Sequence, residues 1–174
     1  MYNILRQRQG KTAMITEVEG SIFEDIKPYT VIVHQCNAKG WIGVGISKEI
    51  RRRWPNVFNE YHNYCSWFKD GHEEEIMGTF VGVKVKPDLI ICNAIAQRTV
   101  GKATQMTDYN AWEVLCAKIS RQTHRVNKMT GKNWTIHVPY NIGCGLGGGD
   151  WDQMMEIFQK HFGESDVELV IHKI

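Results

Sequence analysis

Short apolar runs of strand length alternate with longer amphipathic runs along most of this chain. Strand-like runs occupy residues 13–19, 30–35, 78–86, 89–95, 134–140 and 167–172, and helix-like runs occupy residues 46–54, 108–126 and 151–162. Strands that alternate with helices predict an α/β layer fold. Because no internal repeat divides the sequence, residues 1–174 are expected to form a single domain.

Several runs predict more than their own conformation. Residues 30–35 are almost all β-branched or apolar, which is typical of a central strand that is covered on both faces. The long helix at 108–126 is expected to be capped by Thr107 or Asp108, and the helix at 46–54 should stop at Pro55. One face of the long helix should be buried, and it is made by Trp112, Leu115, Cys116 and Ile119.

Composition and charge narrow the function classes. Hydrophobic residues make up 43% of the chain and charged residues 23%, as in ordinary globular proteins. The 21 basic and 19 acidic residues give a charge of +2, which does not indicate nucleic-acid binding, and the cluster at 51–53 reads as a solvated helix face. The five cysteines form no C-x-x-C pair, which predicts reduced thiols in a cytosolic protein. No apolar run has the length of a membrane span.

The most informative segment is residues 141–150, which lies between a strand-like run and a helix-like run. It holds five glycines within the seven residues 143–149. Glycine lets backbone N–H groups converge on a negative group without obstruction by a Cβ atom. The segment therefore predicts a phosphate-binding loop.

Two familiar phosphate motifs do not fit this loop. Gly143, Gly145 and Gly148 satisfy G-x-G-x-x-G, but a dinucleotide fold needs a further strand with an acidic residue about 20 positions on. Here the next strand ends in His-Lys-Ile at the end of the sequence. A P-loop is also excluded, because no Gly-Lys-Ser/Thr follows the glycines.

A second glycine-containing loop, at residues 37–45, also follows a buried strand and opens a helix. Carboxyl ends of parallel strands meet at one edge of a sheet. The two loops are therefore expected to face each other across a cleft and to hold a diphosphate with its attached sugar. Asn37 stands at the strand end, where its amide suits ribose hydroxyls.

These motifs resemble those of the macrodomain (Appr-1-p processing) family. The resemblance rests on His34-Gln-Cys-Asn37, on Gly43-Val-Gly45-Ile and on the segment from Pro139 to Trp151, and it extends from about Ile15 to Ile174. The Gly-Cys-Gly-Leu sequence is most similar to the branch with the ADP-ribose-1″-phosphate phosphatases and the terminal ADP-ribose glutamate hydrolase. This resemblance implies a three-layer α/β/α fold with a central mixed sheet.

The resemblance also implies a binding site for ADP-ribose. Adenine would lie near the first turn, the diphosphate between the two glycine loops, and the distal ribose near Asn37. The binding residues it implies are Gly20, Ser21, Ile22, Gly40, Gly43, Val44, Gly45, Ile46, Ile142, Gly143, Cys144, Gly145, Leu146, Gly147 and Gly148.

The chain departs from the family at three positions. Many relatives have an aspartate for the adenine amine where this chain has Ser21. The glutamate hydrolase has a catalytic lysine where Gln97 stands here, and an aspartate where Gly147 stands. A lysine-adduct mechanism is therefore not expected, which favours removal of a phosphate or binding without turnover.

Three residues are candidates for catalysis, and each has a structural alternative. Asn37 would contact the ribose, or form an Asx-turn. His34 would act as acid, base or nucleophile, or be a hydrogen-bonded core histidine. Asp150 would position a water as general base, and it also fits the N-cap position of the last helix. Cys144 has no readable His–acid pair and is expected to fill apolar space.

The sequence thus predicts an ADP-ribose-binding hydrolase, most simply one that removes phosphate from ADP-ribose-1″-phosphate. The alternatives are a non-catalytic reader of ADP-ribose, a protein that removes ADP-ribosyl or acyl groups from a modified macromolecule, and a Rossmann-type nucleotide enzyme. We expect no metal, no cofactor and no membrane partner, and a monomer in the cytoplasm.

Overall fold

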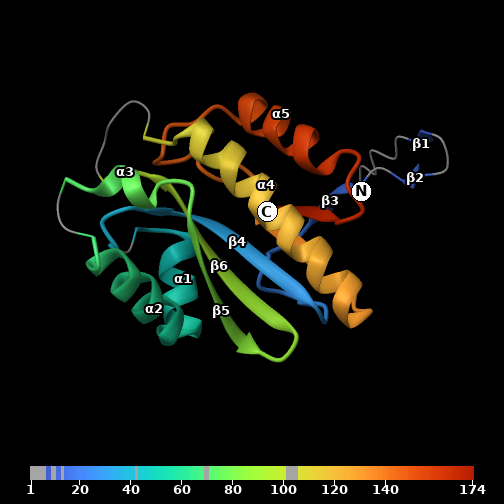
Figure 1. The fold of residues 1–174 in the computed structure, drawn as a ribbon, viewed down its shortest axis with the longest axis horizontal. Helices are drawn as coiled ribbons and strands as arrows, with labels where there is room; N and C mark the ends of the chain where they lie inside the picture. The colour runs from blue at the N-terminus through green and yellow to red at the C-terminus, as the bar shows by residue number, and fades with distance from the viewer. Residues whose placement is uncertain (1–6, 9–10, 13, 42, 69–70, 101–105) are drawn as a thin grey trace.

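The computed structural model describes residues 7–8, 11–12, 14–41, 43–68, 71–100 and 106–174 (Figure 1). Its main sheet has six strands in the order β3-β8-β7-β4-β6-β5. Five of them are parallel, and β5 at the edge runs antiparallel to β6. The strands are β3 (Ile15–Glu19), β4 (Thr30–Asn37), β5 (Phe80–Lys86), β6 (Leu89–Gln97), β7 (Thr135–Pro139) and β8 (Leu169–Lys173). The strands β1 (Gln7–Arg8) and β2 (Lys11–Thr12) pair separately.

Helices cover the sheet from both sides. The helices α4 (Tyr109–Thr130) and α5 (Trp151–Phe162) pack on one face, and α1 (Ile46–Arg53) and α2 (Pro55–Ser66) lie on the other (Figure 1). A short helix, α3 (Glu73–Ile76), leads into β5. The mixed sheet between two helical layers confirms the predicted α/β/α fold.

The apolar pattern of the sequence located most of these elements. The face predicted for the long helix is buried, with Trp112, Leu115, Cys116 and Ile119 at most 5% exposed. The sequence reasoning missed α2 and α3. Pro55 does end α1, as expected, but it also starts α2, because a proline ring at the first helical position obstructs nothing.

Strand order creates a crevice at the centre of the sheet. The parallel strands β4 and β7 are neighbours, so their carboxyl ends meet at one edge. The chain leaves β4 toward α1 on one face and leaves β7 toward α5 on the other. Connections that diverge in this way leave an opening between adjacent strands, where α/β proteins commonly bind ligands.

Candidate functional site

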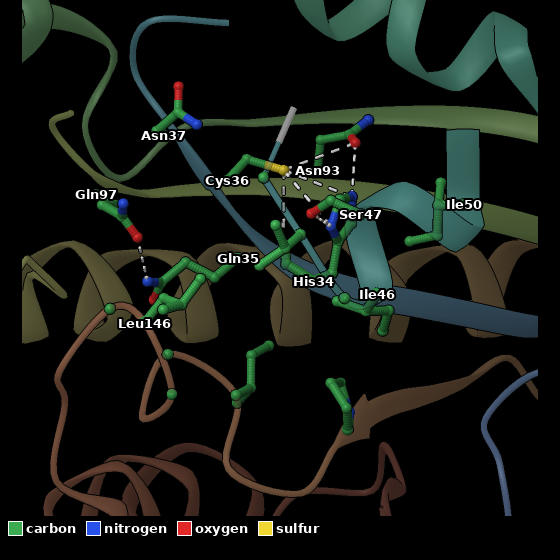
Figure 2. Close-up of a pocket in the computed structure, with 18 of the residues that line it drawn as sticks. His34, Gln35, Cys36, Asn37, Ile46, Ser47, Ile50, Asn93, Gln97 and Leu146 are labelled. Carbon is green, nitrogen blue, oxygen red and sulfur yellow. Dashed lines mark hydrogen bonds between the residues drawn. The ribbon is translucent and has the colours of Figure 1, made fainter. Parts of the chain in front are cut away.

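A cavity of about 620 Å³ lies at this crevice, a volume within the usual range for small-molecule sites. Its walls include both glycine loops, and its floor is formed by the carboxyl-terminal half of β4 (Figure 2). The two loops that the sequence singled out, a hundred residues apart, therefore share one cavity, as predicted.

Most of the predicted site residues line this cavity. They are His34, Asn37, Gly43, Val44, Gly45, Ile46, Ile142, Gly143, Gly145, Leu146 and Gly147. Seven others are not among its lining residues, namely Gly20, Ser21, Ile22, Gly40, Cys144, Gly148 and Asp150. Ile22 is a core residue that packs with Ile32 and Ile50, so the expected adenine position at this turn stays a prediction.

The first turn of α1 offers open backbone donors to the cavity. Gly45 occupies the N-cap position and supplies no capping side chain. The N–H groups of Gly45, Ile46 and Ser47 have no hydrogen-bond acceptor among the described residues. Unpaired N–H groups at the positive end of a helix dipole favour an anion. The start of α1 is thus a suitable place for a phosphate.

The loop after β7 offers a second set of donors. The N–H groups of Gly145, Leu146 and Gly147 likewise have no acceptor within the described part of the chain. Successive free N–H groups in a turn form a concave anion site of the kind called a nest. The residues of both sets line one cavity, which suits a ligand with two linked phosphates.

Some glycines of this loop are required by packing rather than by a ligand. A Cβ atom on Gly147 would lie 2.6 Å from Thr107 Oγ1 and 2.7 Å from the carbonyl oxygen of Gly143. A Cβ atom on Gly143 would lie 2.6 Å from Gln35 Oε1. A Cβ atom on Gly145 would meet nothing within 4 Å. Only the last position is open enough to accept a side chain.

A hydrogen-bond network beneath the loop explains this close approach. Trp112 Nε1 donates to Gln35 Oε1 at 2.8 Å, and Gln35 Nε2 donates to Thr107 Oγ1 at 2.9 Å and to Gln97 Oε1 at 3.1 Å. Thr107 Oγ1 donates in turn to the carbonyl oxygen of Gly143 at 2.5 Å. The network joins β4, β6 and α4 to the glycine loop and so holds the loop in place.

His34 is a buried residue of the cavity floor, and both of its ring nitrogens are engaged. Nε2 lies 2.7 Å from Asn93 Oδ1, and Nδ1 lies 3.2 Å from Ser47 Oγ (Figure 2). Burial lowers the pKa of His34 to about 4, against a smaller opposing effect of the Asn93 hydrogen bond. The ring is therefore neutral at pH 7, and a nucleophilic role would require it to release Ser47.

Asn37 shapes the first loop through its side chain. Its Oδ1 accepts hydrogen bonds from the N–H groups of Lys39 at 3.1 Å and Trp41 at 3.2 Å, and from the Tyr61 hydroxyl at 3.1 Å. Its Nδ2 donates to the carbonyl oxygen of Trp41 at 2.8 Å. The Asx-turn interpretation thus describes these bonds, and a ribose contact could use only the second Nδ2 hydrogen.

Carboxylates cap the helices α4 and α5. Asp150 accepts a hydrogen bond from the N–H of Gln153 at 3.2 Å, which confirms its predicted N-cap position on α5. Asp108 accepts from the N–H of Ala111 at 2.9 Å and caps α4. The start of α5 therefore holds its own anion, unlike the start of α1. Among the described residues that line the cavity there is no carboxylate.

The rim of the cavity is apolar and exposed. Trp41, Val44, Tyr140 and Leu146 line it, although they are between 41% and 64% exposed. Exposed apolar side chains gathered around a cavity indicate a surface that a ligand covers. Arg51 is the one charged side chain among the described lining residues, and its guanidinium lies 4.5 Å from the centre of the Phe58 ring.

Several polar residues of the site were not predicted from the sequence, among them Gln35, Ser47 and Asn93. Gln35, Ser47 and Asn93 line the cavity, and all three belong to its hydrogen-bond networks. A polar residue within an apolar strand, such as Asn93 in β6, was the available signal, because a buried amide needs partners. The described residues include no group of three or more His, Cys, Asp or Glu that could hold a metal ion.

Comparison with known proteins gives sequence relatives of one kind. No family model matches the chain. It is 26% identical over 153 residues to an ADP-ribose 1″-phosphate phosphatase of Candida albicans, and the match covers 84% of this chain and 93% of that protein. A phosphatase of the same name from Aspergillus oryzae is 34% identical over 55 residues. That match covers 32% of this chain and only 27% of the relative.

Solved structures agree in fold. A protein of unknown function from Bacteroides thetaiotaomicron superposes with a TM-score of 0.78 at 23% identity, covering 92% of this chain and 98% of that one. A macrodomain protein from Streptomyces coelicolor superposes with a TM-score of 0.68 at 20% identity, and the match covers 91% of this chain and 97% of that one. DarTG of Thermosipho africanus in complex with ADP-ribose superposes with a TM-score of 0.64 at 16% identity, and the match covers 84% of this chain and 38% of that one.

The chain therefore has the fold of the solved macrodomains. Its sequence is similar to those of the two ADP-ribose 1″-phosphate phosphatases. None of the helices within the described residues is long and apolar enough to cross a membrane.

Proposed function

We propose that the protein binds ADP-ribose in this cavity and removes phosphate from ADP-ribose-1″-phosphate. One observation carries the proposal: the residues Gly45–Ser47 and Gly145–Gly147, whose backbone N–H groups have no acceptor among the described residues, line the same cavity. A diphosphate bound between them would be held by backbone donors from both sides. The names of the two curated relatives and the ADP-ribose in the Thermosipho complex support this ligand.

The rim suits the rest of such a ligand. ADP-ribose carries an aromatic base and two sugars, and apolar side chains such as Trp41 and Leu146 would lose water when it binds. Arg51 would attract the negative charge, since no carboxylate among the described lining residues opposes it. Adenine near Gly20–Ile22 and the distal ribose near Asn37 remain part of the proposal.

Asn37, His34 and Asp150 are the proposed catalytic residues. Asn37 and His34 line the cavity and Asp150 does not, so a role for Asp150 requires its exposed carboxylate to turn away from Gln153. All five cysteines are free thiols, which suits the cytosolic location that we propose. We also propose that the protein is a monomer.

A reader function is the second candidate, and the composition of the cavity favours it. General acid–base catalysis most often uses a carboxylate or a titrating histidine. The described lining residues include no carboxylate, and the pKa of His34 lies far below 7. A protein that only recognises ADP-ribose, free or attached to a macromolecule, needs neither group.

Phosphate release separates the two candidates. The protein is mixed with ADP-ribose-1″-phosphate and inorganic phosphate is assayed, while calorimetry measures the binding of ADP-ribose. Release supports the phosphatase, and tight binding without release supports the reader. Absence of ADP-ribose binding would overturn both.

A further inference from the structure

The polar cluster at the cavity floor is a chain of hydrogen bonds with a single direction. It runs from the carbonyl oxygen of Val81 through Asn93 and His34 to Ser47. Figure 2 shows the part from Asn93 through His34 to Ser47. These residues come from β5, β6, β4 and α1, so the chain crosses the sheet and ends at the first turn of a helix. Its direction decides what Ser47 offers to a ligand.

The direction is set at the backbone. The carbonyl oxygen of Val81 can only accept, so the group facing it at 3.0 Å is the Asn93 amide nitrogen. Asn93 Oδ1 then faces His34 and can also only accept. His34 Nε2, 2.7 Å away, must therefore carry the proton and donate it. A neutral imidazole with Nε2 protonated has a bare Nδ1.

The neutral state of His34 follows from its surroundings. The side chain is 3% exposed, and burial lowers its pKa to about 4. The titratable group in contact with the ring is Cys36, whose Sγ lies 3.5 Å from Nε2. Burial raises the pKa of that thiol well above its usual range, so it carries no negative charge that would stabilise a protonated ring. At neutral pH the direction of the chain is therefore constant.

The last hydrogen bond reaches the cavity. Since Nδ1 of His34 has no proton, the Ser47 hydroxyl donates its own proton across the 3.2 Å between them. Ser47 lines the cavity, is only partly buried, and has no other side-chain hydrogen bond among the described residues. What it leaves for a ligand is the pair of acceptor positions on its oxygen.

We propose that Ser47 accepts a hydrogen bond from an O–H group of the bound ligand or of the attacking water, and so selects for a hydroxyl against a bare phosphate oxygen at this place. The proposal rests on the proposed function for the identity of the ligand. A phosphate oxygen has no proton to give and would meet the lone pairs of Ser47. A ribose hydroxyl or a water has one, so the phosphates must lie beside Ser47, on the backbone donors of the two loops.

Substitution of Ser47 tests the contact. Ser47→Ala removes the acceptor and leaves His34 neutral, while Ser47→Thr keeps a hydroxyl at the same place. Ser120→Ala, which removes a serine hydroxyl from α4 that is bonded to Ser165, is the matched control. ADP-ribose affinity and phosphate release are measured for all of them.

Loss of one hydrogen bond of ordinary strength corresponds to about a tenfold effect. A ribose hydroxyl at Ser47 predicts that Ser47→Ala weakens ADP-ribose binding about tenfold. An attacking water predicts instead that kcat falls about tenfold at unchanged affinity. Ser47→Thr should restore whichever value fell, and Ser120→Ala should change neither. If Ser47→Ala behaves as wild type in both assays, or Ser47→Thr restores nothing, the proposal is wrong.

A measurement without ligand separates this proposal from the proposed function. The ¹⁵N chemical shifts of His34 in the wild-type protein should show Nε2 protonated and Nδ1 bare at pH 7. Protonation at Nδ1 would reverse the chain and overturn the inference, whatever the protein binds. Failure of the wild type to bind ADP-ribose would overturn the proposed function, and the tautomer would then decide the hydrogen-bond direction by itself.

Discussion

Replacement of Gly147 by alanine tests whether the glycine loop is shaped by the polar network beneath it. The new Cβ atom would lie 2.6 Å from Thr107 Oγ1, 2.7 Å from the carbonyl oxygen of Gly143 and 2.9 Å from Gln35 Nε2. A backbone oxygen cannot move aside without the loop itself, so the loop must shift. Overpacking of this kind costs about 1–3 kcal/mol. Loss of the Thr107 hydrogen bond to Gly143 adds about 1 kcal/mol, for a total of about 2–4 kcal/mol.

Gly145→Ala is the matched control, because its Cβ atom would meet nothing within 4 Å. Urea unfolding measures the free energy of unfolding of both variants, and calorimetry measures their affinity for ADP-ribose. For Gly147→Ala the free energy of unfolding should fall by about 2–4 kcal/mol. If the loop instead moves away from the hydrogen-bond network, the cost appears in ligand binding. The affinity for ADP-ribose should then fall about thirtyfold or more. The free energy of unfolding of Gly145→Ala should stay within about 0.5 kcal/mol of wild type. Equal behaviour of the two variants in both assays would refute the reasoning.

Three further predictions concern single positions. A Cβ atom at Gly43 would meet nothing within 4 Å, so the free energy of unfolding of Gly43→Glu should stay within about 0.5 kcal/mol of wild type. The added carboxylate should abolish ADP-ribose binding. Retained affinity in calorimetry would show that the phosphate site lies elsewhere. The pKa of His34 is about 4 in the folded protein and about 6.5 in the unfolded chain. Between these pH values the unfolded state binds more protons than the folded state. The free energy of unfolding should therefore fall by up to about 3 kcal/mol as the pH drops from 6.5 to 4. Urea titrations at several pH values measure this fall in the wild type and in His34→Gln. The variant should lack the part of the fall that comes from protonation of His34. Asp150→Ala should lower the free energy of unfolding by about 1 kcal/mol, and Asp150→Asn by much less, since asparagine also caps helices. If phosphate release disappears in Asp150→Asn, the carboxylate of Asp150 takes part in catalysis.

The sequence was most informative where structure is local. The six strands of the main sheet and the helices α1, α4 and α5 follow from apolar periodicity, and the caps at Asp108 and Asp150 follow from residue type at a helix start. It was least informative about α2, where a proline that ends one helix also begins another. Proline excludes a helix interior but permits a first turn, so the residue alone does not tell which helix it belongs to.

The roles of individual glycines show the same division. From the sequence, Gly143, Gly145, Gly147 and Gly148 are all predicted to contact the ligand. The structure separates Gly143 and Gly147, which press against Gln35 and Thr107, from Gly145, which has open space. The difference depends on side chains about forty and a hundred residues away, which no local pattern contains.

The sequence by itself determined that two buried strands end in glycine corners with polar residues beside them, because strand periodicity and glycine content are properties of neighbouring residues. Only the tertiary structure decided that β4 lies next to β7 and that their helices diverge to opposite faces, which places both corners on one cavity. It also decided that His34, Ser47 and Asn93 form one directed chain of hydrogen bonds. Strand order brings these residues together across 13 and 59 positions, and hydrogen-bond direction follows from which backbone carbonyl stands at the end of the chain.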